Sequence, residues 1–330
     1  MGTKDPILNP KMIGGRVPGQ RAWHGPDLQD EDFVIKLDAA CMAELEHVVA
    51  EQVKAPVPTL VLQPSHFQLD ACAKLMAGVK KRLDDGLGFI ILDRLPVDRW
   101  TQPQVHDVYW LLGSLLEPPV AQEWSGKMIY DVRYDGQGYT ADTRTALTPE
   151  GLDMHNDSSM GEAPANYISL LCLQTAVEGG KSSLSSAYAA HNHFIDKHPD
   201  LLERLYQPFY RDKQEYQPAG AERTNWHPIF AMDKDQLRIR FNNRVIRRGY
   251  QKTGQVLDNA GAQAVEIMNN FLADPAHRHD FWMERGQIQI LNNRSIVHGR
   301  TPYIDHEAPE KRRHLVRLWL RAGDRRQFRG

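Results

Sequence analysis

The first third of the chain carries apolar residues at helical spacing. Between residues 37 and 53, and again between 68 and 84, apolar side chains recur every three or four positions, the pattern of a helix with one buried face. A proline soon follows the first stretch, and an Asp-Asp-Gly-Leu-Gly turn ends the second. The next segment, GFIILDRL, is short and almost continuously apolar. The pattern therefore predicts two helices that lead into a buried strand.

In the second half, the pattern changes to short apolar segments separated by turns. The clearest of them are NYISLLCLQTA, QLRIRFNN, GQIQILNN and HLVRLWLR, which are rich in β-branched or aromatic residues and predict strands. Two longer amphipathic segments among these strands, residues 187–206 and 256–273, are each predicted to form a helix. Many short strands, with helices early and one helix inserted late, favour a mainly β fold, a sandwich or barrel core with helical cover.

The domain organisation follows from the distribution of Pro, Gly and charged residues. Residues 1–30 are rich in all three and predict an extended N-terminal arm. No linker divides the remainder, so we expect one domain over residues 31–330. The chain of 330 residues is long for one domain, but β barrels and sandwiches with insertions reach this size.

Composition and charge narrow the class of partner. The net charge is −2, which gives no global field to attract nucleic acid or an anionic membrane. The longest apolar runs are far shorter than a membrane span. The three cysteines lie far apart, and no apolar leader precedes them, so we expect a reducing, cytoplasmic location. We therefore expect a small-molecule partner rather than nucleic acid or membrane; assembly into a homo-oligomer stays open.

The first candidate for chemistry is His155-Asn-Asp157. In an extended segment, residues two positions apart project to the same side, so the imidazole and the carboxylate would converge on one point. One further histidine would complete a face of two histidines and one carboxylate, which leaves three coordination positions open and is typical of iron(II) oxygenases. A His-x-Asp pair also occurs by chance, and the plain alternative is a surface turn.

A second cluster, near the C-terminus, makes a metal site more specific. His298 lies in a polar turn between two apolar segments, and Arg313 and Arg317 follow in the next segment. Strand alternation places both arginines on one face. The planar guanidinium binds two carboxylate oxygens at once, and an arginine inside a barrel is costly without an anion. The alternative is a basic edge strand, which the apolar context LVRLWLR makes less favourable.

Four segments in this order resemble one known family. MHND, SLLCLQTAVEGGKSSLSSA, GQIQILNNRSIVHGRTPY and RRHLVRLWLR resemble the taurine dioxygenase family, within the clavaminate synthase-like group of iron(II)- and 2-oxoglutarate-dependent oxygenases. The resemblance covers roughly residues 90–322. It implies a double-stranded β-helix, or jelly-roll, core in the domain predicted above. It also implies that His155, Asp157 and His298 are the iron ligands.

The resemblance also implies how the cosubstrate is held. Arg317 would pair with the distal carboxylate of 2-oxoglutarate, and Arg313 would assist near its other end. Ser182 matches a hydroxyl position that hydrogen-bonds the cosubstrate, where many relatives carry Thr. Two positions depart from the common pattern: Gln287 stands where relatives often have Asp, and Asn156 separates the two ligands. We expect Gln287 to be structural and Asn156 to point away from the metal.

The implied reaction consumes 2-oxoglutarate and O2 at iron(II), oxidises a C–H bond of a small molecule, and releases succinate and CO2. Hydroxylation is the default outcome, while desaturation or cyclisation would use the same residues. Two other functions fit the same metal ligands. One is a non-catalytic metal- or ligand-binding β-barrel, and the other is a hydrolytic metalloenzyme that turns over without oxygen.

The substrate side is less well defined by the sequence. Tyr130 and Arg133 begin a polar, Gly-containing stretch, residues 130–149, that leads into the metal motif and is either a lid or an ordinary surface loop. Arg240 and Asn242 share one face of a candidate strand. If these side chains line the barrel, they predict an amino-acid-like or anionic substrate.

Overall fold

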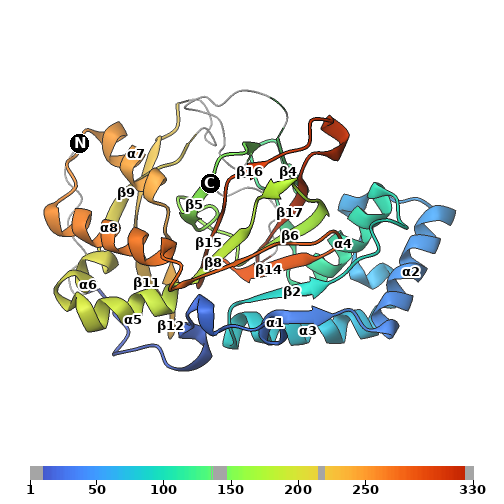
Figure 1. Cartoon of the computed structure of the whole chain (residues 1–330), viewed down its shortest axis with the longest axis horizontal. Coiled ribbons are helices and arrows are strands. Elements are labelled where there is room, and N and C mark those ends of the chain that lie inside the picture. The colour runs from blue at the N-terminus through green and yellow to red at the C-terminus, as the bar shows by residue number, and fades with distance from the viewer. Residues whose placement is uncertain (1–9, 135, 137–146, 215–219, 324–330) are drawn as a thin grey trace.

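Two β-sheets form the centre of the protein in a computed structural model that describes residues 10–134, 136, 147–214 and 220–323 (Figure 1). The larger sheet has the order β1-β2-β14-β6-β17-β3, with β4 also paired to β17, and the smaller has the order β13-β8-β15-β5. Neighbouring strands are antiparallel except β1 and β2. The strands of the larger sheet are β1 (Val34–Lys36), β2 (Phe89–Asp93), β14 (Ile288–Asn292), β6 (Tyr167–Gln174), β17 (His314–Leu320), β3 (Pro119–Val120) and β4 (Tyr130–Arg133). Those of the smaller sheet are β13 (Arg278–Phe281), β8 (Ser182–Ser186), β15 (Ile296–Arg300) and β5 (Leu152–His155).

The two sheets share an apolar core. Phe89, Ile168 and Trp319 of the larger sheet pack in one cluster with Leu184 and Ile296 of the smaller sheet. This is the arrangement of a jelly roll, so the predicted fold class is confirmed.

Strand β17 shows how the sequence alternation sorts side chains between two environments. Val316 and Leu318 belong to the cluster that packs against the outer helices. Trp319 belongs to the cluster between the sheets, and Arg317 alternates onto the same side. The face that the sequence predicted for the arginines therefore points into the jelly roll.

Helices α2 (Ala39–Lys54), α3 (Asp70–Asp85) and α4 (Gln102–Leu116) cover the outer face of the larger sheet, at the right of Figure 1. The first two confirm the predicted helices. Their starts are capped: Asp38 accepts a hydrogen bond from a main-chain N–H of α2, and Glu44 accepts from two at the start of α3. Helix α4 was not predicted, because its continuous apolar run VYWLLGSLL lacks a polar face.

A second helical layer covers the smaller sheet. It contains α5 (Ala187–Lys197), α6 (Pro199–Tyr206), α7 (Asn243–Thr253) and α8 (Asn259–Ala273), together with strands β9 (Pro208–Asp212), β10 (Thr224–Pro228), β11 (Phe230–Asp233) and β12 (Gln236–Ile239). The helix predicted over residues 187–206 is two helices, because Pro199 cannot continue the first and begins the second. Helix α7 was not predicted; its many arginines hide a short apolar stripe.

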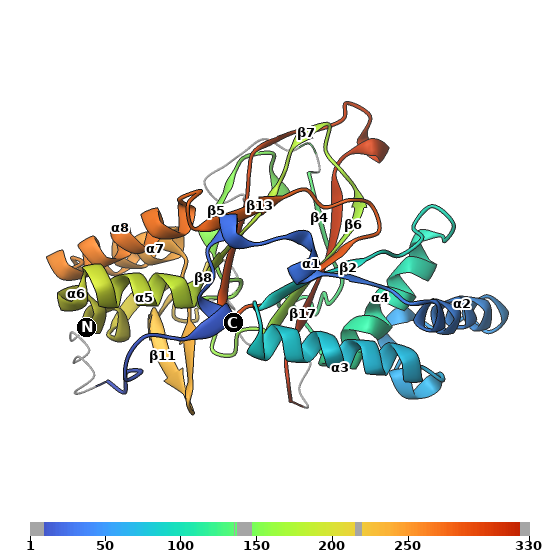
Figure 2. The ribbon, with the colours of Figure 1, turned by 60° about the horizontal axis from the view of Figure 1, so that its bottom comes forward.

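The N-terminal segment is bound along the body of the protein. It contains η1 (Gly19–Ala22), η2 (Gly25–Asp27) and α1 (Asp30–Phe33). The main chain of Val17 exchanges two hydrogen bonds with the side chain of Asn192 on α5, and Trp23 Nε1 donates to Leu87 O just after α3. In Figure 2 the segment, in blue, passes from the α5 side to the α3 side, so it connects the two helical layers.

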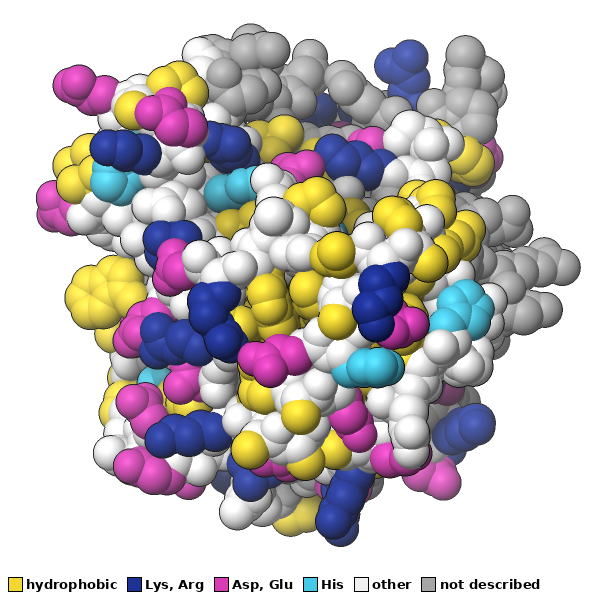
Figure 3. Space-filling view, turned by 90° about the vertical axis from the view of Figure 1, so that its right-hand side faces the viewer, with side chains coloured by type: hydrophobic (Ala, Val, Ile, Leu, Met, Phe, Trp, Pro, Cys, Tyr) yellow, Lys and Arg dark blue, Asp and Glu magenta, His cyan; other side chains and the backbone are white. Residues whose placement is uncertain are grey.

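The remaining elements are short. They are η3 (Thr59–Val61), η4 (Pro64–His66), η6 (Pro309–Lys311) and the two-stranded pair β7 (Glu178–Gly179) and β16 (Tyr303–Ile304). On the face that includes α2, charged side chains of both signs are interspersed with apolar ones (Figure 3). Within the described ranges, no helix combines the length and apolar character needed to cross a membrane.

The Gly-Gln pair before β14 has a structural explanation. Gly286 has a φ of +86°, and a Cβ there would lie 2.2 Å from Leu95 O, so only glycine fits. Gln287 Oε1 accepts from Glu284 N, and its Nε2 donates to Asp93 Oδ1. The residue that departs from the common pattern therefore closes a turn.

Candidate metal centre

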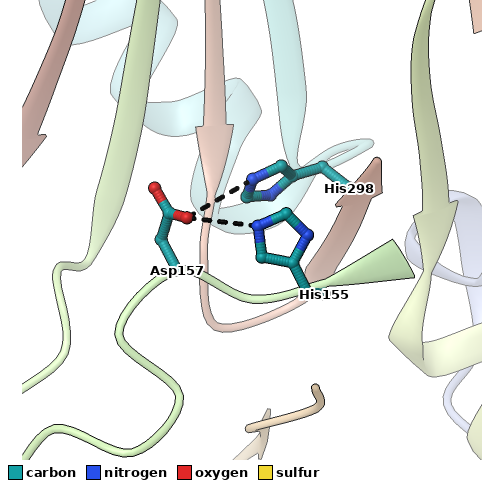
Figure 4. Close-up of side chains that lie close together, drawn as sticks. All are labelled: His155, Asp157 and His298. Atoms are coloured by element: carbon teal, nitrogen blue, oxygen red, sulfur yellow. Dashed lines mark ion pairs between the residues drawn. The ribbon is translucent and has the colours of Figure 1, made fainter. Parts of the chain in front are cut away.

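Strand pairing brings three candidate ligands together from distant parts of the chain. His155 ends β5, and its Cα is the register partner of His298 in the middle of β15. Asp157 follows two residues after His155. Its Oδ1 lies 3.3 Å from His155 Nε2 and 3.7 Å from His298 Nε2, as the dashed lines of Figure 4 show. The convergence predicted from the His-x-Asp spacing and the distant histidine is present.

Both imidazoles are suited to be neutral metal ligands. His155 Nδ1 lies 2.8 Å from Asp153 O, so this nitrogen carries the proton and the lone pair of Nε2 faces Asp157. His298 is buried, and burial together with the neighbouring His155 lowers its pKa to about 3. It therefore remains neutral at physiological pH.

Asp157 is held as a carboxylate. Burial raises the pKa of its carboxyl, but the charge of Arg317, with smaller contributions from other neighbours, lowers this pKa by more, and the net shift is strongly downward. Arg317 Nη1 donates to Asp157 Oδ2 at 2.9 Å, and Trp319 Nε1 donates to the same oxygen at 2.8 Å. Oδ1 is thus the oxygen that faces the imidazoles.

The donor set fits a divalent first-row metal. The three ligand atoms lie within 4.8 Å of one another, and no other cluster of this kind occurs among the residues that the structure describes. An octahedral ion with bonds of about 2.1 Å separates neighbouring ligands by about 3 Å, so the three ligand atoms would move closer together around a bound ion. Two histidines and one carboxylate leave open positions for other ligands, as in non-haem iron(II) oxygenases.

The sequence model of the taurine catabolism dioxygenase TauD, TfdA family matches residues 53–319 of this chain. The chain belongs to this family. It is 26% identical over 318 residues to FR-33289 synthase of Streptomyces rubellomurinus, which covers 94% of this chain and 92% of that protein.

Solved structures of two oxygenases share the fold. One is asparagine oxygenase in complex with Fe(II), 3-hydroxyasparagine and succinate, with a TM-score of 0.64, 16% identity, and coverage of 87% of this chain and 93% of that one. The other is the non-heme iron oxygenase OrfP in complex with Fe, succinate and (3S)-hydroxy-L-Arg, with a TM-score of 0.65, 14% identity, and coverage of 88% and 94%.

Family membership and the triad establish the reaction class. The protein is an iron(II)- and 2-oxoglutarate-dependent oxygenase that acts on a small molecule. Bound iron(II) supplies the oxygen chemistry, with 2-oxoglutarate and O2 as cosubstrates. The contribution of this TauD-family chain is to place ligands, hold charges and exclude water.

The predicted cosubstrate residues lie at different distances from the triad. Arg317 touches Asp157 directly. Arg313 precedes β17 and is buried, its guanidinium lies 5.3 Å from the ring of Tyr303, and burial lowers its pKa. Ser182 is buried on β8, opposite Arg300 in register.

Arg300 links this region to the metal ligands. It lies two residues after His298 on β15 and therefore on the same face of the strand. Its guanidinium donates to Thr148 O at 2.8 Å and also to Glu150 O, just before β5. The neighbouring Arg313 adds to burial in lowering the pKa of Arg300 to about 10. This arginine was not among the predicted site residues, although it follows the histidine ligand in the VHGR motif.

The four substrate candidates divide into two groups. Tyr130 is buried beside the site, with the Arg317 guanidinium 5.1 Å from its ring. Arg240 Nη1 donates to Gly161 O at 2.7 Å, in the segment just after Asp157. The main chain of Asn242 forms an isolated antiparallel β-bridge with that of His155. Its side chain, however, caps α7, because Asn242 Oδ1 accepts a hydrogen bond from Val245 N.

Arg133 does not join the others. Its guanidinium donates to Pro309 O at the start of η6, and across the ranges that the structure describes its side chain makes no hydrogen bond or ion pair with the triad. Most of the stretch proposed as a lid, residues 135 and 137–146, lies outside the described residues.

Besides Arg300, three residues at the site were not predicted as part of it. Trp319 lies two residues after Arg317 on β17 and so on the same face, which made strand periodicity a usable signal. Gln122 accepts from Arg317 Nε at 2.7 Å, and Asn293 hydrogen-bonds the main chain of Asp157. Neither has a local sequence signal, because each reaches the site only through the tertiary fold.

Proposed function

We propose that this oxygenase acts on a small molecule that carries an acidic group, and that Arg313 and Ser182 hold the distal carboxylate of 2-oxoglutarate. The observation that carries the proposal is the buried Arg313 guanidinium. No carboxylate pairs with it in the described part of the chain. A buried guanidinium is costly unless an anion neutralises it.

The positions of the two arginines favour exchanging the roles expected from the sequence. Arg317 donates a hydrogen bond to Asp157, one of the three metal ligands. Its guanidinium is therefore close to the place where the metal-binding end of 2-oxoglutarate, or the substrate, would bind. Arg313 lies farther along, where its guanidinium and that of Arg300 both lie over the Tyr303 ring, 5.3 and 4.7 Å from the ring centroid. Since 2-oxoglutarate carries a carboxylate at each end of its carbon chain, the more distant Arg313 suits the distal one.

A comparison of two 2-oxo acids tests this assignment. 2-Oxobutyrate offers the same metal-binding end as 2-oxoglutarate but lacks the distal carboxylate. We expect the iron-loaded wild-type protein to prefer 2-oxoglutarate, and Arg313→Gln to reduce this preference by about 100-fold. Arg317→Gln should retain the preference, and Arg133→Gln serves as a matched control. Anaerobic equilibrium binding gives the dissociation constants of both 2-oxo acids for all four proteins. Loss of the preference in Arg317→Gln alone would return the distal carboxylate to Arg317, as the sequence resemblance implied.

The acidic substrate is supported by the cations near the triad and by the ligands of related structures. Arg317 and Arg240 both lie beside the metal motif. Asparagine oxygenase and OrfP are solved with a hydroxylated asparagine and a hydroxylated arginine. An amino-acid-like substrate would meet these guanidinium groups with its carboxylate.

Substrate-dependent succinate formation tests whether the substrate carries an acidic group. Amino acids, phosphonates and sulfonates are each compared with a neutral ester or amide counterpart. We expect stimulation by at least one acid and little by its neutral counterpart. Equal stimulation by both members of a pair would exclude recognition of the acidic group. Consumption of the substrate without oxygen and without succinate formation would indicate a hydrolase.

A further inference from the structure

We propose that Trp319, Asn293 and Asn156 are positioning residues that hold Asp157 as a ligand through one oxygen only. The inference rests on the iron site described above and assigns it three residues that do not touch the metal. Coordination through a single oxygen keeps one more position open for 2-oxoglutarate or O2 than coordination through both.

The two carboxylate oxygens of Asp157 have different surroundings. Oδ1 faces the two imidazoles, at 3.3 and 3.7 Å from their Nε2 atoms. Oδ2 accepts from Arg317 Nη1 at 2.9 Å and from Trp319 Nε1 at 2.8 Å. Two donors, one of them charged, occupy the second oxygen and prevent the carboxylate from turning both oxygens toward a metal. Because the indole is rigid and buried, its N–H direction is fixed.

The main chain of Asp157 is fixed by a buried amide. Asn293 Oδ1 accepts from Asp157 N at 3.0 Å, and Asn293 Nδ2 donates to Asp157 O at 2.9 Å. One side chain therefore satisfies both backbone groups of the ligand, as a neighbouring strand would. Asn293 is only 1% exposed, so water does not compete for these bonds.

Asn156 connects this segment to the one that carries His298. Its Nδ2 donates to Asn293 O at 2.9 Å and to Ile296 O at 2.8 Å, while its Oδ1 accepts from Phe241 N at 2.9 Å. Ile296 begins β15, two residues before His298. The two asparagines thus tie together the segments that supply Asp157 and His298.

Trp319→Phe removes the indole N–H and keeps an aromatic ring in the core between the sheets. We expect its iron(II) dissociation constant, measured by anaerobic competition with a chelator, to rise at least about 10-fold. Trp110→Phe is the matched control, because Trp110 is also buried and its Nε1 donates to Leu62 O at 3.0 Å in the outer helical layer. This control should lose thermal stability but retain wild-type iron affinity. Asn293→Ser is a second variant, expected to weaken iron binding in the same direction.

An infrared difference spectrum, iron-loaded minus iron-free, reports the coordination mode. The separation between the two carboxylate stretching bands narrows when both oxygens bind a metal, so we expect narrowing in Trp319→Phe and none in Trp110→Phe. Wild-type iron affinity in a folded Trp319→Phe protein, with an unchanged spectrum, would overturn the positioning role and leave the iron site intact. A wild-type protein that binds no iron would overturn both the positioning role and the proposed function.

Discussion

Two motifs in this chain have the same form and opposite outcomes. His155-Asn156-Asp157 follows an extended strand, and its two outer side chains meet with Nε2 and Oδ1 3.3 Å apart. His191-Asn192-His193 lies within helix α5, and its outer side chains diverge. His191 Nε2 pairs with the hydroxyl of Tyr206 at 2.9 Å, whereas the His193 ring packs 4.8 Å from that of Phe271.

The difference comes from backbone geometry. Residues two apart project to the same side of a strand but about 200° apart around a helix. The central asparagine is buried in both motifs and turns away from the outer pair in each. Asn156 bonds the segment before His298, and Asn192 bonds the N-terminal segment at Val17. Spacing alone therefore does not define a metal site; the element that carries the spacing does.

Removal of one histidine from each motif should give the largest contrast. His155→Ala should weaken iron(II) binding at least about 100-fold and abolish 2-oxoglutarate turnover, because it removes a direct ligand. His193→Ala should leave both unchanged. The amount of iron bound per protein after anaerobic loading measures the loss of iron binding, and succinate formation measures the loss of turnover. Equal loss in the two variants would mean that folding, not ligation, explains it.

Low pH should destabilise the iron-free protein through His191. Burial lowers the pKa of His191 to about 4, below its ordinary value of 6.5. Its neutral form therefore stabilises the fold above about pH 6.5, and this stability is lost as pH falls toward 4. Between pH 7.5 and pH 5 the loss is about 2 kcal/mol.

The variant His191→Phe isolates this contribution. Its free energy of unfolding in urea should fall by about 2 kcal/mol less than that of the wild type over the same interval. An identical fall in both proteins would show that His191 remains protonated or accessible in the folded state.

The central asparagines should give the smallest contrast. Asn192→Ala should cost about 1–2 kcal/mol of unfolding free energy, because it leaves the main chain of Val17 without its partner. Its iron affinity should be unchanged. Asn156→Ala should show a comparable loss of stability together with weaker iron binding, measured by urea unfolding and chelator competition. Weakened iron binding in Asn192→Ala would remove the distinction between the two motifs.

Much of the fold could be predicted from periodicity. The two early helices, the late helix and the strand that carries Arg317 have clear alternation or helical spacing, and the structure confirms them. The polar turn predicted at His298 is wrong: this residue lies in the middle of β15 (Ile296–Arg300), whose small and polar residues gave no strand pattern. Helix α4 is apolar on nearly every side because it is packed between α2, α3 and the larger sheet. Its periodicity is therefore hidden, as is that of the arginine-rich α7.

The site was predictable where side chains converge along one strand or across two paired strands. The triad and the inward face of β17 belong to this class. Gln122 and Asn293 act through contacts with distant side-chain or main-chain groups, which no local pattern encodes. The placement of each arginine relative to Asp157 also depends on how β17 pairs with its neighbours, so the roles of Arg313 and Arg317 in holding 2-oxoglutarate stay a prediction that the binding comparison tests.

The most direct measurement is the fate of 2-oxoglutarate in the presence of the purified protein. We predict that succinate forms only when iron(II) and O2 are both present, and that Asp157→Ala abolishes its formation while the variant stays folded. If 2-oxoglutarate remains unchanged with wild-type protein, iron(II) and O2 over the full panel of acidic substrates, the assignment of this triad to 2-oxoglutarate oxidation is contradicted.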